Sequence, residues 1–148
     1  MGAQHLKIPQ YVKEVLEAVQ KERRLVVATS SKSAVPNAAP IGILRFVDDE
    51  TLLIVDNYFL KTGNNLKKNP YVAISGWHME EKEGSLSTKA AYQLKGQARV
   101  ESSGDLYERV KAEIKSKRPD LPVRAIVLIK VEEIYDVKPG PNAGKRIV

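Results

Sequence analysis

The chain has 148 residues, of which 43% are hydrophobic and 28% are charged, a composition typical of one globular domain. It has no cysteine and only two histidines, which excludes disulfides and iron–sulfur clusters and argues against catalytic triads and zinc sites. The formal charge of +6 suits either a phosphate-bearing ligand or a nucleic acid. Because the basic residues are scattered along the chain, we interpret most of them as solvated surface charge and predict no nucleic-acid partner.

The first half of the chain predicts a helix and three strands. Apolar residues between Ile8 and Val19 recur at helical spacing, and Pro9 suits a first helical turn. The strands are expected at residues 25–29, 35–47 and 51–55. The second of them contains Pro36 and Pro40, which indicates an edge or bulged strand.

The second half predicts two helices and three strands. The helices are expected at residues 62–68 and 105–117, and the strands at residues 71–75, 91–101 and 124–131, the last continuing towards 137. Asn69-Pro70 ends the first of these helices, and Ser103 is a candidate cap for the second. The charged residues 79–88 are predicted to be an exposed loop, and residues 138–148 a loose, basic C-terminal tail.

Six strands and three peripheral helices, joined mostly by short turns, predict a mainly β fold of the antiparallel barrel type. We expect one domain spanning residues 1–148, with its core at residues 8–137. No apolar run approaches the ~18 residues of a membrane span, and the N-terminus lacks a signal pattern. A cytoplasmic protein is therefore expected, with no metal site.

The first candidate site follows the strand at residues 51–55. A loop leads from this strand to Lys61 and Thr62, which open the short helix. Helix N-termini present unsatisfied N–H groups and a partial positive charge, so a lysine there is unfavourable unless it is accompanied by an anion. A bound phosphate would match the ammonium, hydroxyl and amide groups. The alternative is that Thr62 caps the helix, answered by Asn65, while Lys61 points into water.

The second candidate segment is residues 36–42, which read Pro-Asn-Ala-Ala-Pro-Ile-Gly. Small side chains on an extended backbone allow a flat ring to lie close to the strand. The alternative is an edge strand whose residues are small for packing reasons. The single tryptophan, Trp77, either stacks on a ring or packs within the fold, and we expect the packing role.

Several stretches of the chain follow one another in a characteristic order. They are A-T-S, P-N-A-A-P-I-G, L-L-I-V-D-N, K-T, N-L-K-K-N-P-Y-V-A and Y-Q-L-K-G-Q-A-R-V. This order resembles the FMN-binding split barrels related to pyridoxamine 5′-phosphate oxidase, over roughly residues 8 to 137. The most specific part is the strand, the Lys-Thr pair and the N-L-x-x-N-P-x-V stretch taken together. The resemblance implies a six-stranded antiparallel split barrel.

The resemblance also implies a site for flavin mononucleotide (FMN). Lys61 and Thr62 would bind its phosphate. The isoalloxazine ring and ribityl chain would be lined by Ala38, Ala39 and Pro40. The polar edge of the ring would receive backbone and side-chain contacts from Val55, Asp56 and Asn57. In this family the flavin lies between two subunits, so the implied unit is a homodimer.

Two departures from the family pattern bear on the activity. Pyridoxamine phosphate oxidases carry an Arg-Lys pair before the small helix, where this chain has Leu60-Lys61. They also carry Arg-x-His near the C-terminus, whereas residues 140–146 here read G-P-N-A-G-K-R. We therefore predict FMN binding without vitamin B6 oxidation.

The sequence leaves the activity itself open. A flavin carries its own redox chemistry, so no acid or base need be evident in the chain. One interpretation is a flavin-dependent oxidoreductase that acts on an unidentified small redox substrate, and another is a non-catalytic electron-transfer flavoprotein. The alternative from a different class is a basic nucleic-acid-binding module. Related barrels bind deazaflavin or haem, which are the alternatives to FMN.

Overall fold

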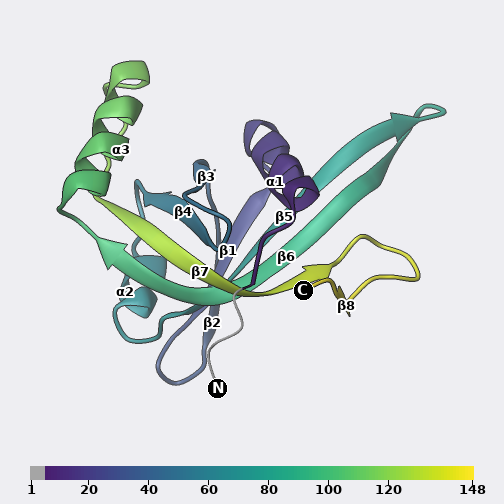
Figure 1. Ribbon diagram of the computed structural model, residues 1–148, viewed down its shortest axis with the longest axis horizontal. Helices are drawn as coiled ribbons and strands as arrows, with labels where there is room; N and C mark the ends of the chain where they lie inside the picture. The colour runs from purple at the N-terminus through teal and green to yellow at the C-terminus, as the bar shows by residue number, and fades with distance from the viewer. Residues whose placement is uncertain (1–5) are drawn as a thin grey trace.

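The computed structural model describes residues 6–148 (Figure 1). Its helices are α1 (Gln10–Glu22), α2 (Lys61–Leu66) and α3 (Asp105–Lys117). Its strands are β1 (Leu25–Ser30), β2 (Pro36–Pro40), β3 (Leu44–Phe46), β4 (Thr51–Asp56), β5 (Tyr71–Lys82), β6 (Ser85–Glu101), β7 (Ala125–Asp136) and β8 (Lys145–Arg146). Within the described range, no helix has the length and apolar character that crossing a membrane requires.

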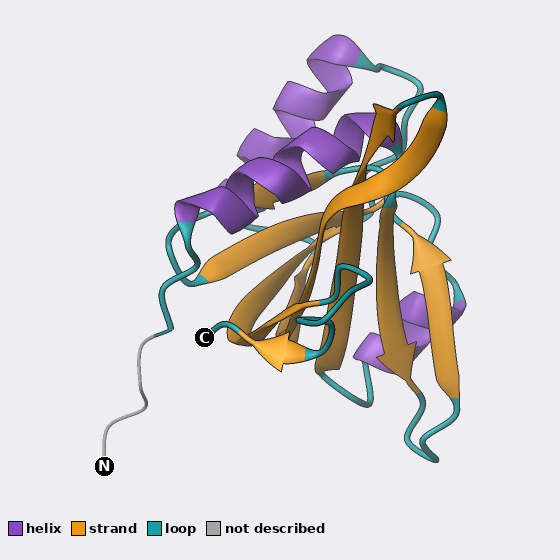
Figure 2. Cartoon of the chain, turned by 90° about the vertical axis from the view of Figure 1, so that its right-hand side faces the viewer, coloured by secondary structure: helices purple, strands orange, loops and turns teal. Residues whose placement is uncertain are grey.

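The strands form one antiparallel sheet that curls into a half-barrel (Figure 2). Their order is β2-β1-β5-β6-β7-β4-β3, and β8 pairs with β7. The predicted mainly β, antiparallel split-barrel fold is therefore confirmed. The sheet has eight strands, because residues 35–47 divide into β2 and β3 and the C-terminal segment contributes β8. Helices α1 and α3 lie towards one end of the sheet and α2 towards the other (Figures 1 and 2).

Helix α1 packs on the main hydrophobic core with its apolar face. Val12, Leu16 and Val19 are each fully buried, as the helical spacing predicts. A Cβ atom at Gly76 would lie only 2.6 Å from Leu16 Cδ2. Glycine at this position of β5 therefore allows the helix to approach the sheet closely.

Strand β4 and the first part of its neighbour β7 are buried on both faces. Leu52 and Ile54 of β4 face the main core, whereas Leu53 and Val55 belong to a second cluster beneath α3. Strands covered on both faces read as continuous apolar runs, which explains the unbroken Leu-Leu-Ile-Val sequence. This double burial fixes the point where β4 ends and the loop towards α2 begins.

The prediction of a loop at residues 79–88 is wrong, because this stretch is part of a long β-hairpin. β5 and β6 remain paired from Met79–Thr88 to Lys82–Ser85. Glu83 and Gly84 have φ values of 52° and 80°, as a two-residue hairpin turn requires. In the described chain, residues 77–82 pair with β6 alone, so this arm projects from the body (Figure 1). Both faces of the arm are accessible to solvent, so its residues are mostly polar. A polar stretch without apolar alternation is typical of a loop, which explains the wrong prediction.

The C-terminal segment is also more ordered than predicted. Lys145 and Arg146 pair with Asp136 and Tyr135 of β7. The two residues that follow, Ile147 and Val148, pack against the main core. The end of the chain is thus held to the sheet and is not a loose tail.

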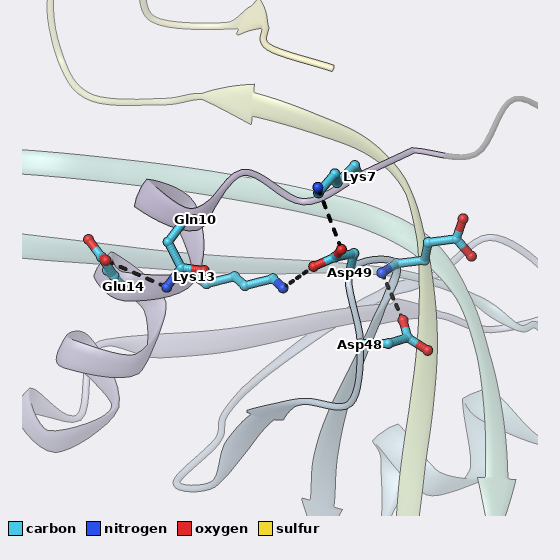
Figure 3. Close-up of polar contacts among 7 residues, drawn as sticks. Lys7, Gln10, Lys13, Glu14, Asp48 and Asp49 are labelled. Atoms are coloured by element: carbon cyan, nitrogen blue, oxygen red, sulfur yellow. Dashed lines mark hydrogen bonds and ion pairs between the residues drawn. The ribbon is translucent and has the colours of Figure 1, made fainter.

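The segment before α1 is anchored to the turn between β3 and β4 (Figure 3). Ile8 N donates to the Asp49 carbonyl oxygen at 2.7 Å. Lys13 Nζ and Lys7 Nζ lie 2.8 Å and 3.8 Å from the Asp49 carboxylate. The hydrogen bond from Lys13, together with its charge, lowers the pKa of Asp49 from its ordinary value of 3.8. Because Lys13 belongs to α1, this contact fixes the helix against the turn.

Candidate ligand-binding cleft

A cleft of about 770 Å³ opens between the C-terminal end of α1, the β2 segment, the loop after β4 and the start of α2. Its volume lies within the ~300–1,000 Å³ typical of small-molecule and cofactor sites. The connection from α3 to β7 contributes Arg118 and Leu121 to the same wall. Residues from four separate segments of the chain therefore meet at one opening.

The structure brings most of the predicted site residues together in this cleft. Those that line it are Ala39, Pro40, Val55, Asn57, Lys61 and Thr62. Ala38 and Asp56 do not line it. In β2 the side chains alternate in direction, so Ala38 is exposed while its neighbours Asn37 and Ala39 are half-buried. Three consecutive strand residues thus cannot all turn their side chains towards one ligand.

Thr62 is buried at the α2 end of the cleft, with only 2% of its surface exposed. Its hydroxyl oxygen accepts a hydrogen bond from Asn37 Nδ2 at 3.1 Å, and Asn65 Nδ2 donates to Thr29 Oγ1 at 3.0 Å. The alternative in which Thr62 caps α2 is wrong, since Leu60 is the N-cap residue and no side chain among the described residues caps the helix. These bonds tie α2 to β1 and β2 and hold the threonine hydroxyl at the cleft.

Two side chains that the sequence analysis expected to contact the ligand, Asp56 and Asn57, hold the loop between β4 and α2 in place. Asp56 Oδ1 accepts from Phe59 N at 2.9 Å and from Arg124 Nη2 at 3.1 Å. The same guanidinium also donates to the Phe59 carbonyl oxygen. Asn57 Nδ2 donates to the Pro122 carbonyl oxygen at 2.8 Å. Asp56 therefore shapes the loop that presents Lys61, and its carboxylate does not line the cleft.

In the part of the chain that the structure describes, four cationic side chains and no carboxylate line the cleft. They are Lys21, Arg23, Lys61 and Arg118. Within residues 6–148, none of the four forms an ion pair with Asp or Glu. Only Lys61 was predicted, because the other three come from helix ends that are distant in the sequence. An excess of positive charge in a cleft favours an anionic ligand.

The side chains that ligate haem iron in proteins are His, Cys, Met and Tyr. Of these types, only Tyr58 lines the cleft among residues 6–148. His78 lies at the base of the β5–β6 arm, with Nδ1 2.8 Å from Glu22 Oε1. His5 lies outside the described residues. Trp77, which the sequence analysis considered for stacking on a ring, is half-buried and does not line the cleft.

Residues 11–138 match the family described as "Pyridoxamine 5′-phosphate oxidase". The chain belongs to this family. A relative, the uncharacterized protein MJ0282 of Methanocaldococcus jannaschii, is 35% identical over 137 residues, which are 90% of this chain and 85% of that protein. The family resemblance that was inferred from the order of the sequence motifs is therefore confirmed.

Solved structures share the fold of this pyridoxamine 5′-phosphate oxidase family member. HupZ of Group A Streptococcus has a TM-score of 0.70 and 25% identity, and the match covers 93% of this chain and 99% of that one. An FMN-binding protein of Syntrophomonas wolfei has a TM-score of 0.69 and 16% identity, with coverage of 87% and 88%. The haem storage protein HutZ of Vibrio cholerae has a TM-score of 0.58 and 17% identity, with coverage of 82% and 91%.

Proposed function

We propose that the cleft binds FMN and that the protein is a flavoprotein. The observation that carries this proposal is the meeting of Lys61, Thr62 and Asn37 at one end of a cleft walled by the small residues of β2. An ammonium group, a hydroxyl and free helix amides suit a phosphate dianion. Family membership and the likeness to the FMN-binding protein of Syntrophomonas wolfei support the same ligand.

In this proposal the flavin lies along β2. Lys61 and Thr62 hold the phosphate, and the ring packs on Ala39 and Pro40. Backbone groups of residues 55–57 face its polar edge. When bound, FMN supplies hydride or single-electron transfer, and the chain binds and orients it.

FMN is favoured over haem by the composition of the cleft wall. A haem protein needs an axial ligand, and in the described chain the cleft offers only Tyr58 for this role. The cationic lining instead suits a ligand with a phosphate group. We therefore do not propose haem storage, the role of HutZ, for this protein.

We further propose a homodimer with the flavin at its interface. Tyr58 and Leu60 stand at the rim of the cleft with 72% and 74% of their surfaces exposed. Large apolar side chains beside a ligand site are typical of surfaces that a partner covers. Light scattering should report about twice the chain mass of 16.5 kDa. A monomer that binds FMN fully would contradict the shared site.

The activity we propose is flavin-dependent oxidation or reduction, with electron transfer to a partner protein as the alternative. Vitamin B6 oxidation is not expected, because Leu60 replaces the arginine of the Arg-Lys pair and no Arg-x-His follows near the C-terminus. Steady oxygen-dependent turnover of pyridoxamine 5′-phosphate would contradict this expectation. We also expect a cytoplasmic protein without a nucleic-acid partner.

Identification of the bound pigment tests the proposed function. The purified protein should be yellow, and denaturation should release one FMN per chain, identified by its mass. Release of haem or of a deazaflavin would contradict the assignment. Nucleic acid that co-purifies in place of a flavin would favour the binding-module alternative.

A further inference from the structure

We infer that the projecting arm, residues 77–90 of β5 and β6, packs its apolar face on the outer sheet face of a second copy of this chain. The inference deepens the proposed homodimer and rests on that part of the proposed function. The outer sheet face is the side of β2, β1 and β5 that points away from the main core. Its centre is a row of paired residues, Ala38, Ala28 and Ala73, which Lys95 of β6 continues.

Among residues 6–148, the helices pack elsewhere and leave the outer sheet face without a helix. Helix α1 lies on the inner side, where a Cβ atom at Gly76 would contact Leu16. Helix α2 is bonded to the same side, through Asn65 and the buried Thr29. Helix α3 covers the second cluster, on β4 and β7. A sheet face of small side chains with no covering helix is therefore available to a partner.

The outer sheet face is hollowed and adjoins the flavin cleft. A recess of about 540 Å³ lies over it and is lined by Ala28, Ala73 and Lys95, among other residues. The row ends at Ala38, whose neighbour Ala39 lines the cleft from the other side of β2. A partner seated on this face therefore lies beside the proposed flavin site.

One face of the arm carries all three of its large apolar side chains, Trp77, Met79 and Leu86. Trp77 points to the outer side because its neighbour Gly76 faces α1. Met79 lies two residues further along the same strand. Thr88 Oγ1 is 3.6 Å from Met79 Sδ, which places Leu86 on this face as well. Leu86 is 69% exposed.

The opposite face of the arm is polar. Glu80 and Lys82 form an ion pair there at 3.2 Å, and they are paired across the hairpin with Ser87 and Ser85. The arm projects from the body as a two-stranded hairpin (Figure 1), and an isolated hairpin is only marginally stable in water. Its apolar face continues the outer sheet face, so one partner surface can cover both.

The distribution of charge favours a second copy as this partner. Residues 79–84 contain three glutamates and one lysine, in a chain whose net charge is +6. Glu81 is exposed on the apolar face of the arm, and Lys95 is exposed on the body. Within the described range, neither forms an ion pair. A face that carries both an unpaired anion and an unpaired cation is complementary to itself in a two-fold dimer.

The strand register gives the position of the two-fold axis. Lys95 is paired with Ala73, and Trp77 lies halfway between Ala73 and Glu81 along β5. In an antiparallel dimer centred on Trp77, each arm covers the alanine row of the other copy, and Lys95 meets the partner's Glu81. The single tryptophan then contacts the partner's Trp77 at the centre, where the strongest contacts of interfaces cluster.

Sedimentation velocity of the full chain over a range of concentrations tests the inference with Leu86→Arg and Ser87→Arg. Both variants add the same charge at neighbouring exposed positions, but only Leu86 lies on the apolar face. Because the new arginine would be buried without a partner, Leu86→Arg should raise the dimer dissociation constant roughly tenfold or more. Ser87→Arg should change it less than about twofold. Equal behaviour of the two variants, or a monomeric wild type, would overturn the inference.

A charge exchange tests the predicted register. Glu81→Lys and Lys95→Glu should each weaken the dimer, because each places two like charges opposite one another. The double variant restores the pair with its signs reversed, so its dimer affinity should return to within about threefold of the wild type. If the two losses add in the double variant, the inference is overturned.

Trp77 is the only tryptophan, so its fluorescence reports directly on the proposed interface. Its emission should shift to longer wavelength as the dimer dissociates on dilution, and an emission that ignores dissociation would overturn the inference. Flavin absorbance of the same samples separates this inference from the proposed function. A dimer that depends on the arm but contains no FMN would refute the flavin alone. A dimer that contains FMN but is unaffected by Leu86→Arg would refute the arm alone.

Discussion

The α2 end of the cleft is held by buried hydrogen bonds, whereas the α1 end is formed by exposed cations at a helix terminus. Thr62 is 2% exposed and bonded to Asn37, and Asn65 of the same helix is bonded to Thr29. Lys21 and Arg23 are exposed, and within residues 6–148 they form no ion pairs. Groups that are fixed before binding lose little conformational entropy when the ligand arrives. The first end therefore suits a permanently bound cofactor, and the second suits a ligand that exchanges.

The largest effect is expected from Thr62→Val at the rigid end. Valine preserves the shape but leaves the Asn37 amide without its acceptor and removes a hydroxyl from the phosphate site. Because Asn37 is half-buried and lines the open cleft, water can bond its amide, so we expect a loss of about 1 kcal/mol in stability. Loss of a hydrogen bond to the phosphate should weaken FMN binding roughly 10- to 100-fold. Urea unfolding and fluorescence titration measure the two effects.

Thr88→Val is the matched control for this change. The Thr88 hydroxyl contacts Met79 Sδ on the projecting arm, far from the cleft lining. Neither stability nor FMN affinity should change appreciably. Equal losses in the two variants would mean that Thr62 has no special role at the α2 end.

A smaller effect is expected from Asp56→Ala, which releases the loop before Lys61. The carboxylate loses its bonds to Phe59 N and to Arg124, an ion pair whose arginine is half exposed. Because water screens such a pair, we expect a loss of about 1 kcal/mol in stability and a few-fold loss in FMN affinity. Glu113→Ala, which breaks the exposed pair with Arg45, is the control and should leave FMN affinity unchanged.

At the α1 end, in contrast, we expect a substitution to raise the stability of the fold. Arg23, the C-cap of α1, has a left-handed conformation with φ 59°. Arg23→Gly relieves a left-handed backbone strain of about 1–2 kcal/mol, while the more flexible unfolded chain costs about 0.4–1 kcal/mol. A net gain in stability of about 0.5 kcal/mol is therefore expected from thermal unfolding. Arg23→Ala removes the same side chain without relieving the backbone, so it should give no gain. A loss of stability in Arg23→Gly would show that the guanidinium supports the fold.

The smallest effect concerns the anchor of α1 at Asp49. Because the folded pKa of Asp49 is lowered by Lys13, its charged form stabilises the fold above the unfolded pKa, near 3.8. This contribution is lost as the pH falls through the folded pKa. Asp49→Asn should therefore lower the melting temperature slightly at pH 7, and the difference from the wild type should vanish in acid. A difference that is constant with pH would exclude the ion pair as its cause.

The parts of the molecule that local patterns specify were predicted correctly. The helical spacing of Val12, Leu16 and Val19 located α1, and the apolar run Leu52–Val55 located β4. The Lys61-Thr62 pair was found because a cation at a helix N-terminus is locally unfavourable. In each case neighbouring residues alone contain the signal.

The remaining features depend on contacts between distant segments. Arg23 and Arg118 reach the cleft only because two helix ends converge there, and Asp56 binds Arg124, which lies in the connection between α3 and β7. The hairpin at residues 79–88 was missed because an arm exposed on both faces has no apolar alternation. The alternation of β2 already implies that Ala38 and Ala39 point in opposite directions, so the exposure of Ala38 could be read from the sequence.

Comparison of FMN with riboflavin, which lacks the phosphate, is the most direct test of the central claim. Lys61→Ala should weaken FMN binding roughly 10- to 100-fold, because a hydrogen bond to a charged group contributes about 1.5–3 kcal/mol, and riboflavin binding should barely change. Lys67→Ala, at the other end of α2, should leave both affinities unchanged. If FMN and riboflavin lost affinity equally in Lys61→Ala, or if neither did, the phosphate would not lie at the α2 end of this cleft.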